Sequence, residues 1–349
     1  MDVVPDNPRF TDQLMRVGPH AGSHRVAARA ALSVAVPLLV LWLIGHQEWS
    51  IYAAFGAFTS LFGRTHVHLS RLQMQSSLAL VLTSSVVAGV VVGLSDYRDW
   101  LAVPIAALVA GVTSLLSDAQ DWHPPGPLFP VFSFAACASL PSEPGDVTVA
   151  ALVAGGSAAF AVVVGGLGSA WRVHRRPDSA VRTSLRRVSF SLIAPRHAVR
   201  CTASCLLAGS VATGIGIGHP YWAMVSAVVP LTHRDVRGQL IRGAHRIVGT
   251  AAGLVLTAIL LAFDPAGFAL ILVIVALQAG AELWVGRNYA LALISITPLA
   301  LLMTHLVVPT PATILLFDRG VETLIGVVVG IGVGWLTRAP HRHVPAASA

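Results

Sequence analysis

Long apolar stretches without a single ionisable side chain constrain this 349-residue chain more than any other feature. Residues 72–95 form one such stretch and residues 147–171 form another. A helix needs about 20 mostly apolar residues to cross the hydrocarbon core of a bilayer. Further apolar runs cover residues 26–45, 49–63, 101–117, 128–140, 201–218, 221–232, 247–263, 265–281, 289–304 and 321–337. Because these runs are continuous rather than alternating, the sequence predicts an all-α membrane protein with about twelve transmembrane helices.

The composition excludes several other classes of protein. Hydrophobic residues make up 55% of the chain and charged residues only 11%, whereas soluble domains carry about 25% charged residues. A water-soluble globular domain and a disordered chain are therefore both excluded. The three cysteines, Cys137, Cys201 and Cys205, show no metal-ligand spacing. With no phosphate-binding loop and no nucleophile elbow, we expect no metal, no cofactor and no enzymatic activity.

The basic residues predict the orientation of the spans. The sequence contains 23 basic residues and no lysine, so every one is an arginine. If the amino terminus is cytoplasmic, twelve spans place all arginines except Arg98 and Arg319 in cytoplasmic segments, as the positive-inside rule requires. We therefore expect a multi-pass protein of the inner (plasma) membrane with both termini cytoplasmic. The lipid bilayer is then its surroundings, and no nucleic-acid partner is expected, because the arginines lie between apolar runs.

An internal repeat is visible around two histidines. The segment Ile44-Gly45-His46 recurs 173 positions later as Ile217-Gly218-His219, and a tryptophan follows three residues after each histidine. The arginines at 71 and 242 also correspond. We predict two parallel six-helix repeats related by an axis along the membrane normal. The expected organisation is a cytoplasmic tail (1–24), the first repeat (25–171), an Arg-rich cytoplasmic linker (172–195), the second repeat (196–337) and a cytoplasmic tail (338–349).

The second span of each repeat is short. Residues 49–63 and 221–232 would reach roughly 18–23 Å as helices, less than the roughly 30 Å of hydrocarbon. Paired short segments at corresponding positions are typical of the binding site of a transporter. Two interpretations remain open: broken helices at such a site, or helices that polar flanks extend to full length.

Aromatic and arginine side chains near these short spans are candidates for substrate binding. Arginine holds a carboxylate through two parallel hydrogen bonds, and an aromatic ring can stack on a flat substrate. Arg242 and Arg246 are four residues apart and share a helix face. The alternative is that the arginines obey the positive-inside rule alone and the aromatic residues belong to the interfacial belt. The candidate set is Trp49, Tyr52, Tyr221, Trp222, Arg71, Arg242 and Arg246.

Ionisable residues at membrane depth are candidates for proton coupling, because charge there is expensive and usually functional. Histidines titrate near neutral pH. The candidates are His46, His219, Glu282 and Glu322. The alternative interpretation places both histidines in exposed outer turns and pairs Arg319 with Glu322 or Asp318 in a structural ion pair near the outer surface.

The second half of the chain also carries motifs of a known family. They include His-Pro-Tyr-Trp-Ala at 219–223, Arg-Ile-Val-Gly-Thr-Ala-Ala-Gly at 246–253 and Arg-Asn-Tyr-Ala at 287–290. The chain resembles the fusaric acid resistance (FUSC) or aromatic acid exporter-like membrane proteins, which are related more distantly to the plant aluminium-activated malate transporters. The first half keeps Trp49, Gly56 and Arg71 but lacks the Arg-Ile-x-Gly-Thr element.

The resemblance implies a secondary transporter that exports organic anions, often aromatic acids, with the proton gradient as its energy source. Larger relatives carry a sizeable cytoplasmic domain, whereas only the short linker occupies that place here. An anion channel and a non-transporting membrane scaffold or assembly partner remain as alternatives. Glycines at every fourth position, as at 326, 330 and 334, permit close helix contact within the bundle or between subunits, so a homo-oligomer is also possible.

Overall fold

The computed structural model describes residues 9–20, 22–63, 69–175, 194–307 and 310–338. Their regular structure is entirely helical, which confirms the predicted all-α class. Most of the linker expected at 172–195, the start of the amino-terminal tail (residues 1–8) and nearly all of the carboxyl-terminal tail (residues 339–349) lie outside the described residues.

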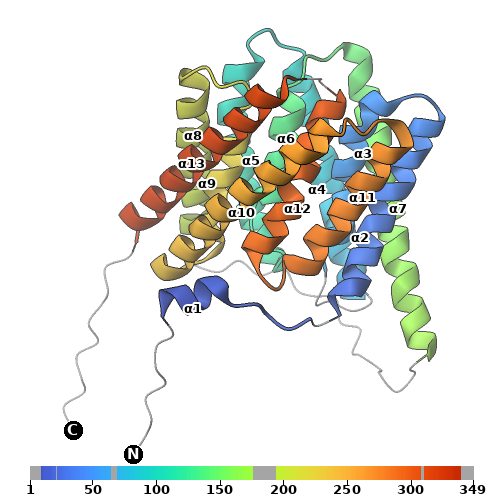
Figure 1. The fold of residues 1–349 in the computed structure, drawn as a ribbon, viewed down its shortest axis with the longest axis horizontal. Helices are drawn as coiled ribbons and strands as arrows, with labels where there is room; N and C mark the ends of the chain where they lie inside the picture. Colours follow the sequence, from blue (N-terminus) through green and yellow to red (C-terminus); the bar gives the residue numbers. More distant parts are fainter. Residues whose placement is uncertain (1–8, 21, 64–68, 176–193, 308–309, 339–349) are drawn as a thin grey trace, which may run out of the picture.

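The first half of the chain contains a short amino-terminal helix and six helices of the bundle (Figure 1). These are α1 (Phe10–Met15), α2 (Ser23–Leu43), α3 (Ser50–Ala57), α4 (Leu69–Gly93), α5 (Arg98–Gln120), α6 (Leu128–Ala138) and α7 (Pro144–Arg175). The 3-10 turns η1 (Gln47–Trp49) and η2 (Phe58–Leu61) flank α3.

The second half contributes six more helices, and its second helix is short, as in the first half. These are α8 (Ala194–Gly214), α9 (Tyr221–Val228), α10 (Val236–Ala262), α11 (Gly267–Trp284), α12 (Tyr289–Val307) and α13 (Ala312–Leu336). The 3-10 turn η3 (Pro230–Thr232) follows α9. Each of the twelve apolar runs in the sequence therefore overlaps one helix from α2 to α13.

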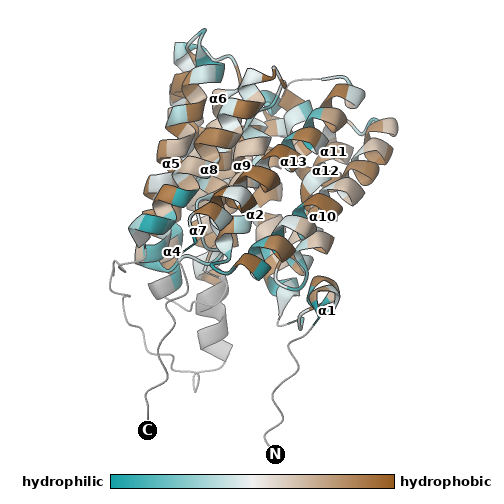
Figure 2. Ribbon diagram, turned by 90° about the vertical axis from the view of Figure 1, so that its left-hand side faces the viewer, coloured by the Kyte–Doolittle hydropathy of each residue, from teal (hydrophilic) through white to brown (hydrophobic). Residues whose placement is uncertain are grey.

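The chain is a multi-pass membrane protein. Within the described residues, seven helices are long and apolar enough to cross a bilayer: α2, α4, α5, α7, α10, α11 and α12. Large apolar side chains such as Leu80 (72% exposed) and Leu152 (70% exposed) point outward from these helices, where lipid covers them without the penalty that water imposes. Figure 2 shows apolar residues through the middle of the bundle and hydrophilic residues toward its ends.

Helix contacts in the two halves correspond. Helix α4 packs on α6 and α7, and α10 packs on α12 and α13; α3 packs on α7, and α9 on α13. Between the halves, α5 packs on α8 and α11 packs on α2. Glycines permit the closest approaches: a Cβ atom at Gly56 of α3 would collide with the backbone of Ala154 on α7, and one at Gly330 of α13 would collide with Ala227 on α9. Small residues at such contacts let helix backbones pack closely in lipid.

Both short second spans end in carbonyl groups that side chains of the following helix satisfy. Arg71 Nε donates to the Gly63 carbonyl at 3.0 Å, and Gln75 Nε2 donates to the Phe62 carbonyl at 3.2 Å. In the second half, Gln239 Nε2 donates to the His233 carbonyl at 3.0 Å. Backbone groups left open at membrane depth need such partners, so the side chains of α4 and α10 stabilise the places where α3–η2 and α9–η3 stop.

The amino-terminal helix and the carboxyl end of α13 lie at the same end of the bundle, which we name the terminal end (Figure 1). The segment after α1 is hydrogen-bonded to the loop between α11 and α12 at this end. Gly18 N donates to the Arg287 carbonyl at 2.9 Å, and Asn288 Nδ2 donates to the Leu14 carbonyl at 3.2 Å. We name the opposite end, where the turns before α3 and α9 lie, the far end.

Candidate functional site

A cavity of about 480 Å³ lies where α3 and α6 of the first half meet α9 to α13 of the second half. At the terminal end its lining includes residues 123–125, residues 232–233 and residues 285–286, which are loop or helix-end segments. At its deepest it reaches Thr304 of α12 and Arg319 of α13. The cavity therefore runs inward from a mouth at the terminal end.

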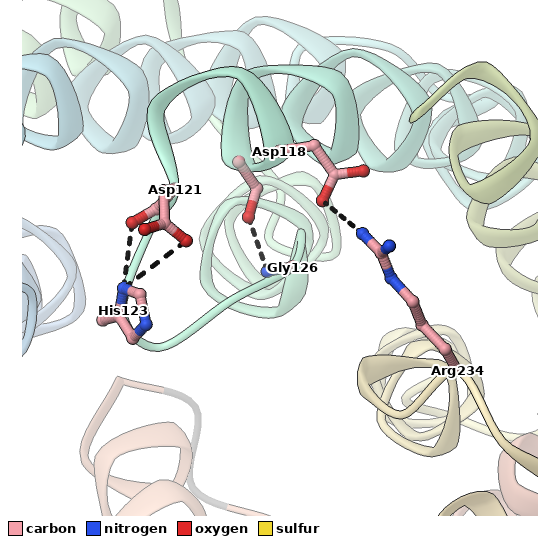
Figure 3. Close-up of polar contacts among 6 residues, drawn as sticks. Asp118, Asp121, His123, Gly126 and Arg234 are labelled. Atoms are coloured by element: carbon pink, nitrogen blue, oxygen red, sulfur yellow. Dashed lines mark hydrogen bonds and ion pairs between the residues drawn. The ribbon is translucent and has the colours of Figure 1, made fainter. Parts of the chain in front are cut away.

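Polar contacts hold the loop that borders this mouth (Figure 3). Gly126 N donates to Ser117 Oγ at 2.8 Å, and the ring of His123 lies 2.9 Å from the Asp121 carbonyl oxygen. Arg234, just before α10, pairs with Asp118 of α5 at 3.8 Å. This pair joins the two halves of the chain beside the mouth. Because it is partly exposed, its expected contribution to stability is only about 0–1 kcal/mol.

Aromatic rings form much of the cavity wall. Phe132 lies 4.7 Å from Trp222 and 4.9 Å from Phe55 between ring centroids, the latter pair edge to face. Phe58 and Phe129 meet at 5.5 Å. Such walls accept another flat ring through offset or edge-to-face contacts.

Two arginines of α10 approach the cavity from one side and share Tyr289 of α12. Arg246 Nη1 donates to the Tyr289 hydroxyl at 3.0 Å, and its Nε and Nη2 donate to Ser226 Oγ at 3.3 and 3.2 Å. The guanidinium carbon of Arg242 lies 3.6 Å from the centroid of the Tyr289 ring. Tyr289 therefore orients both cations, one through its hydroxyl group and one through its ring.

A third guanidinium group, that of Arg319, lies at the deep end of the cavity. Arg319 is 1% exposed, and its guanidinium carbon lies 3.9 Å from the centroid of the Trp222 ring. None of its three guanidinium nitrogens has a hydrogen-bond partner among the described residues. A buried charge without hydrogen bonds is costly. An anion in the cavity would supply the missing acceptors beside an aromatic wall.

Helix α11 adds polar groups to the opposite wall. Gln278 and Glu282 lie one turn apart, are both buried and both line the cavity. The Oε1 atom of Gln278 has no hydrogen-bond partner among the described residues. The site therefore combines three cations, one carboxylate and one amide oxygen without a hydrogen-bond partner among the described residues, in a largely apolar enclosure with several aromatic rings.

The structure brings some of the sequence-predicted residues together. Trp222, Arg242, Arg246 and Glu282 all line the cavity. Glu322 lies one turn beyond Arg319 on α13 and is completely buried.

The other candidates lie outside the lining. Tyr221 is buried behind Trp222, with its hydroxyl 3.4 Å from Thr304 Oγ1. Tyr52 is packed in the apolar core. Arg71, in the first turn of α4, donates to the Gly63 carbonyl just after η2. Arg242 and Arg246 of α10 thus line the cavity, whereas Arg71, the expected counterpart in the first half, forms a hydrogen bond with the backbone.

The first predicted histidine also lies away from the cavity. The ring of His46 stacks on Trp49 at 3.9 Å and donates to Glu48 Oε1 at 2.8 Å in the turn before α3. This hydrogen bond holds the pKa of the Glu48 carboxyl below its usual value. The second, His219, lies 3.3 Å from Asp318 Oδ2.

One sequence interpretation is wrong. Arg319 was expected to pair with Asp318 or Glu322 near the outer surface, but Asp318 pairs with His219 and Arg319 turns toward Trp222 inside the protein. Sequence analysis also missed Tyr289, Gln278 and the phenylalanines of the wall. Gln278 and the phenylalanines lie in apolar runs, where they look like ordinary packing, whereas Tyr289 belongs to the Arg-Asn-Tyr-Ala motif at 287–290, which was a signal.

Within the described residues, no group of three or more His, Cys, Asp or Glu side chains is placed to hold a metal ion. The cavity offers guanidinium groups and aromatic rings for binding.

Comparison with known proteins confirms the family resemblance. Residues 206–333, from within α8 to near the end of α13, match the family described as fusaric acid resistance protein-like. A 94-residue segment is 35% identical to an uncharacterized membrane protein, YvaC, of Bacillus subtilis (strain 168). The similar segment covers 27% of this chain and 15% of that protein. No solved structure matches the chain.

Proposed function

We propose that this chain is a secondary transporter that exports aromatic or other weak carboxylic acids across an inner membrane, with the proton gradient as its energy source. The observation that carries the proposal is Arg319, a buried guanidinium with open donors, held over Trp222 in an aromatic cavity. A carboxylate satisfies the guanidinium through parallel charge-assisted hydrogen bonds. The attached ring replaces water against the phenylalanine wall.

The arrangement of the guanidinium groups supports movement of an anion along the cavity. Arg242 and Arg246 lie on α10 toward the mouth, and Arg319 lies at the deep end. Arg246 is close enough to interact electrostatically with both of the others. An anion that enters at the mouth therefore meets cations at each stage of its path, which raises its local concentration and lowers the barrier to entry.

We further propose that the bundle consists of two parallel six-helix repeats that rock against each other. The matching contacts of α4 with α6 and α7, and of α10 with α12 and α13, support this duplication. The cavity lies between helices of both proposed repeats. Relative motion of the repeats would expose Arg319 first to one side of the membrane and then to the other.

The orientation completes the proposal. With the termini in the cytoplasm, the mouth faces the cytoplasm, and this conformation is ready to accept a substrate for export. Exposed arginines at the terminal end, such as Arg16 and Arg25, agree with the positive-inside rule.

Efflux from proteoliposomes tests the proposal. Vesicles containing purified protein are loaded with radiolabelled 4-hydroxybenzoate near neutral pH, and its release is followed with and without an imposed pH gradient. We expect release that depends on the protein and accelerates with the gradient. Release that is identical in protein-free vesicles would refute the proposal. A current that follows voltage and ignores the pH gradient would instead indicate an anion channel.

A matched pair of variants makes this test specific. Arg319→Met removes the cation in the cavity. Arg287→Met removes a cation that also lies over a tryptophan, Trp284 at 4.5 Å, but outside the cavity lining. We expect loss of efflux only in the first variant.

A further inference from the structure

Two acidic residues flank Arg319 on α13: Asp318 lies one residue toward the far end, and Glu322 lies about one turn toward the terminal end. Asp318 and Glu322 are four residues apart on α13 and therefore share a helix face. Glu322 is 0% exposed, and neither of its carboxyl oxygens has a hydrogen-bond partner among the described residues. A buried carboxylate that makes no close side-chain hydrogen bond is costly, as is the guanidinium of Arg319 one turn away. Arg319 and Glu322 carry opposite charges one turn apart, and both have side-chain atoms without hydrogen-bond partners among the described residues. This arrangement does not favour stability, so it indicates a functional role.

The acidic pair reaches the far end of the bundle through His219. The ring Nδ1 of His219 lies 3.3 Å from Asp318 Oδ2, and the His219 side chain is 15% exposed. The adjoining turn, including Gly216 and Gly218, is exposed. Along α9 the order from the far end to the mouth is His219, then Trp222 beside Arg319, then Thr232 at the mouth. The mouth and the exposed turn at His219 therefore approach α13 from opposite ends of the bundle.

Few other ionisable groups face this point. On α13, Asp318 and Arg319 act on Glu322, and from the start of α9 the neighbours are His219 and Tyr221. From α10, Arg246 acts on Arg319. Arg319 is thus the cation that can interact both with Glu322 and with an anion bound in the cavity.

We propose that Glu322 is the proton-coupling carboxyl and that it competes with the substrate carboxylate for Arg319. A proton that arrives from the far end through His219 and Asp318 neutralises Glu322, and Arg319 is then free to hold an anion that enters through the mouth. When the bundle rocks, the anion leaves at the far end and Glu322 releases its proton at the terminal end. The ionised Glu322 then neutralises Arg319 for the return step. One anion moves outward for each proton that moves inward, which gives the proposed export its coupling step.

This inference rests on the proposed function, and its test separates the two. Binding of 4-hydroxybenzoate to the full-length protein in lipid nanodiscs is measured at several pH values, all above the pKa of the substrate carboxyl group. Because binding requires a protonated Glu322, wild-type affinity should fall as pH rises, by up to about tenfold per pH unit. Glu322→Gln mimics the protonated acid, so it should bind the anion with an affinity that no longer changes with pH. The matched control Glu143→Gln, at an exposed position in the loop before α7, should keep the wild-type profile.

Transport by the same variants adds a second measurement. Glu322→Gln should still exchange labelled for unlabelled substrate across the membrane but should lose efflux driven by a pH gradient. Proton uptake by the wild-type protein, measured in weakly buffered solution when substrate is added, should approach one proton per anion. This second measurement applies even if the variant does not fold.

The outcomes distinguish the two proposals. If the wild-type protein binds no aromatic carboxylate at any pH, the proposed function fails. If it binds the anion without proton uptake, or if Glu322→Gln keeps the wild-type pH profile, the coupling role of Glu322 is refuted while the binding site stands.

Discussion

Arg319→Met should uncouple ligand affinity from stability. The substitution keeps most of the aliphatic side chain and removes the guanidinium group that lies 3.9 Å from the centroid of the Trp222 ring. Removing one partner of a buried, hydrogen-bonded charge pair costs about 2–5 kcal/mol of binding free energy. Since about 1.4 kcal/mol corresponds to a factor of ten, affinity for an aromatic carboxylate should fall on the order of 30- to 5000-fold.

The ligand-free protein should respond in the opposite sense. All three guanidinium nitrogens of Arg319 lack a hydrogen-bond partner among the described residues. Each unmet buried donor costs about 1–3 kcal/mol, whereas the lost cation–π contact is worth up to about 2 kcal/mol. At a pH at which Glu322 is protonated, so that no buried carboxylate loses its counter-charge, the apparent melting temperature of Arg319→Met in detergent should therefore equal or exceed that of the wild-type protein.

Two measurements check this pair of expectations: a binding titration and a thermal melt, each made in parallel on Arg287→Met. Conversely, adding substrate should raise the melting temperature of the wild-type protein and of Arg287→Met but not that of Arg319→Met. If Arg319→Met melts well below both others without ligand, Arg319 is a structural residue and the reasoning is refuted. Unchanged affinity would refute it as well.

Other substitutions test other parts of the structure. Tyr289→Phe keeps the ring but removes the hydroxyl that accepts a hydrogen bond from Arg246 at 3.0 Å. Because one hydrogen bond contributes roughly 1 kcal/mol, substrate affinity in the same titration should fall about five- to tenfold. Unchanged affinity would exclude a positioning role for Tyr289. Gly330→Val places a side chain against the backbone of α9; it should destabilise the bundle by about 1–3 kcal/mol or more, seen as a lower melting temperature or loss of a monodisperse peak in size-exclusion chromatography. Because the three native cysteines are buried, single cysteines can report orientation: a membrane-impermeant thiol reagent added to intact cells should label Asp96→Cys at the far end and not Arg16→Cys at the terminal end. The reverse pattern would place the mouth outside and contradict export.

The local properties of the chain were sufficient to predict its helices. In lipid, the backbone groups of runs such as 72–95 and 147–171 can only form hydrogen bonds within a helix. The positions of the helices along the chain could therefore be predicted without knowledge of how the helices pack. The four-residue spacing of Arg242 and Arg246 likewise predicted that both side chains would share one face of α10, because helix geometry alone decides this.

The cavity depended on which helices meet. Arg71 and Arg242 correspond in the sequence repeat, yet Arg71 donates to the Gly63 carbonyl whereas Arg242 lies over Tyr289 in the cavity. Tyr52 lies in a short second span just as Trp222 does, and both belong to the same apolar core, but only Trp222 also lines the cavity. A repeat predicts equivalent positions along the helices, but the neighbours that each side chain contacts differ between the two halves.

By itself, the amino-acid sequence determined that this chain is helical, that it lives in a membrane, and which family it resembles. The first two properties follow from continuous apolar runs, and the resemblance follows from short motifs; both are local features of the sequence. Only the tertiary structure decided that Arg319 turns inward to Trp222 and leaves Asp318 to His219. That choice depends on the rotation of α13 against α9, which is set by glycine contacts between residues about a hundred positions apart and not by any local preference of the chain.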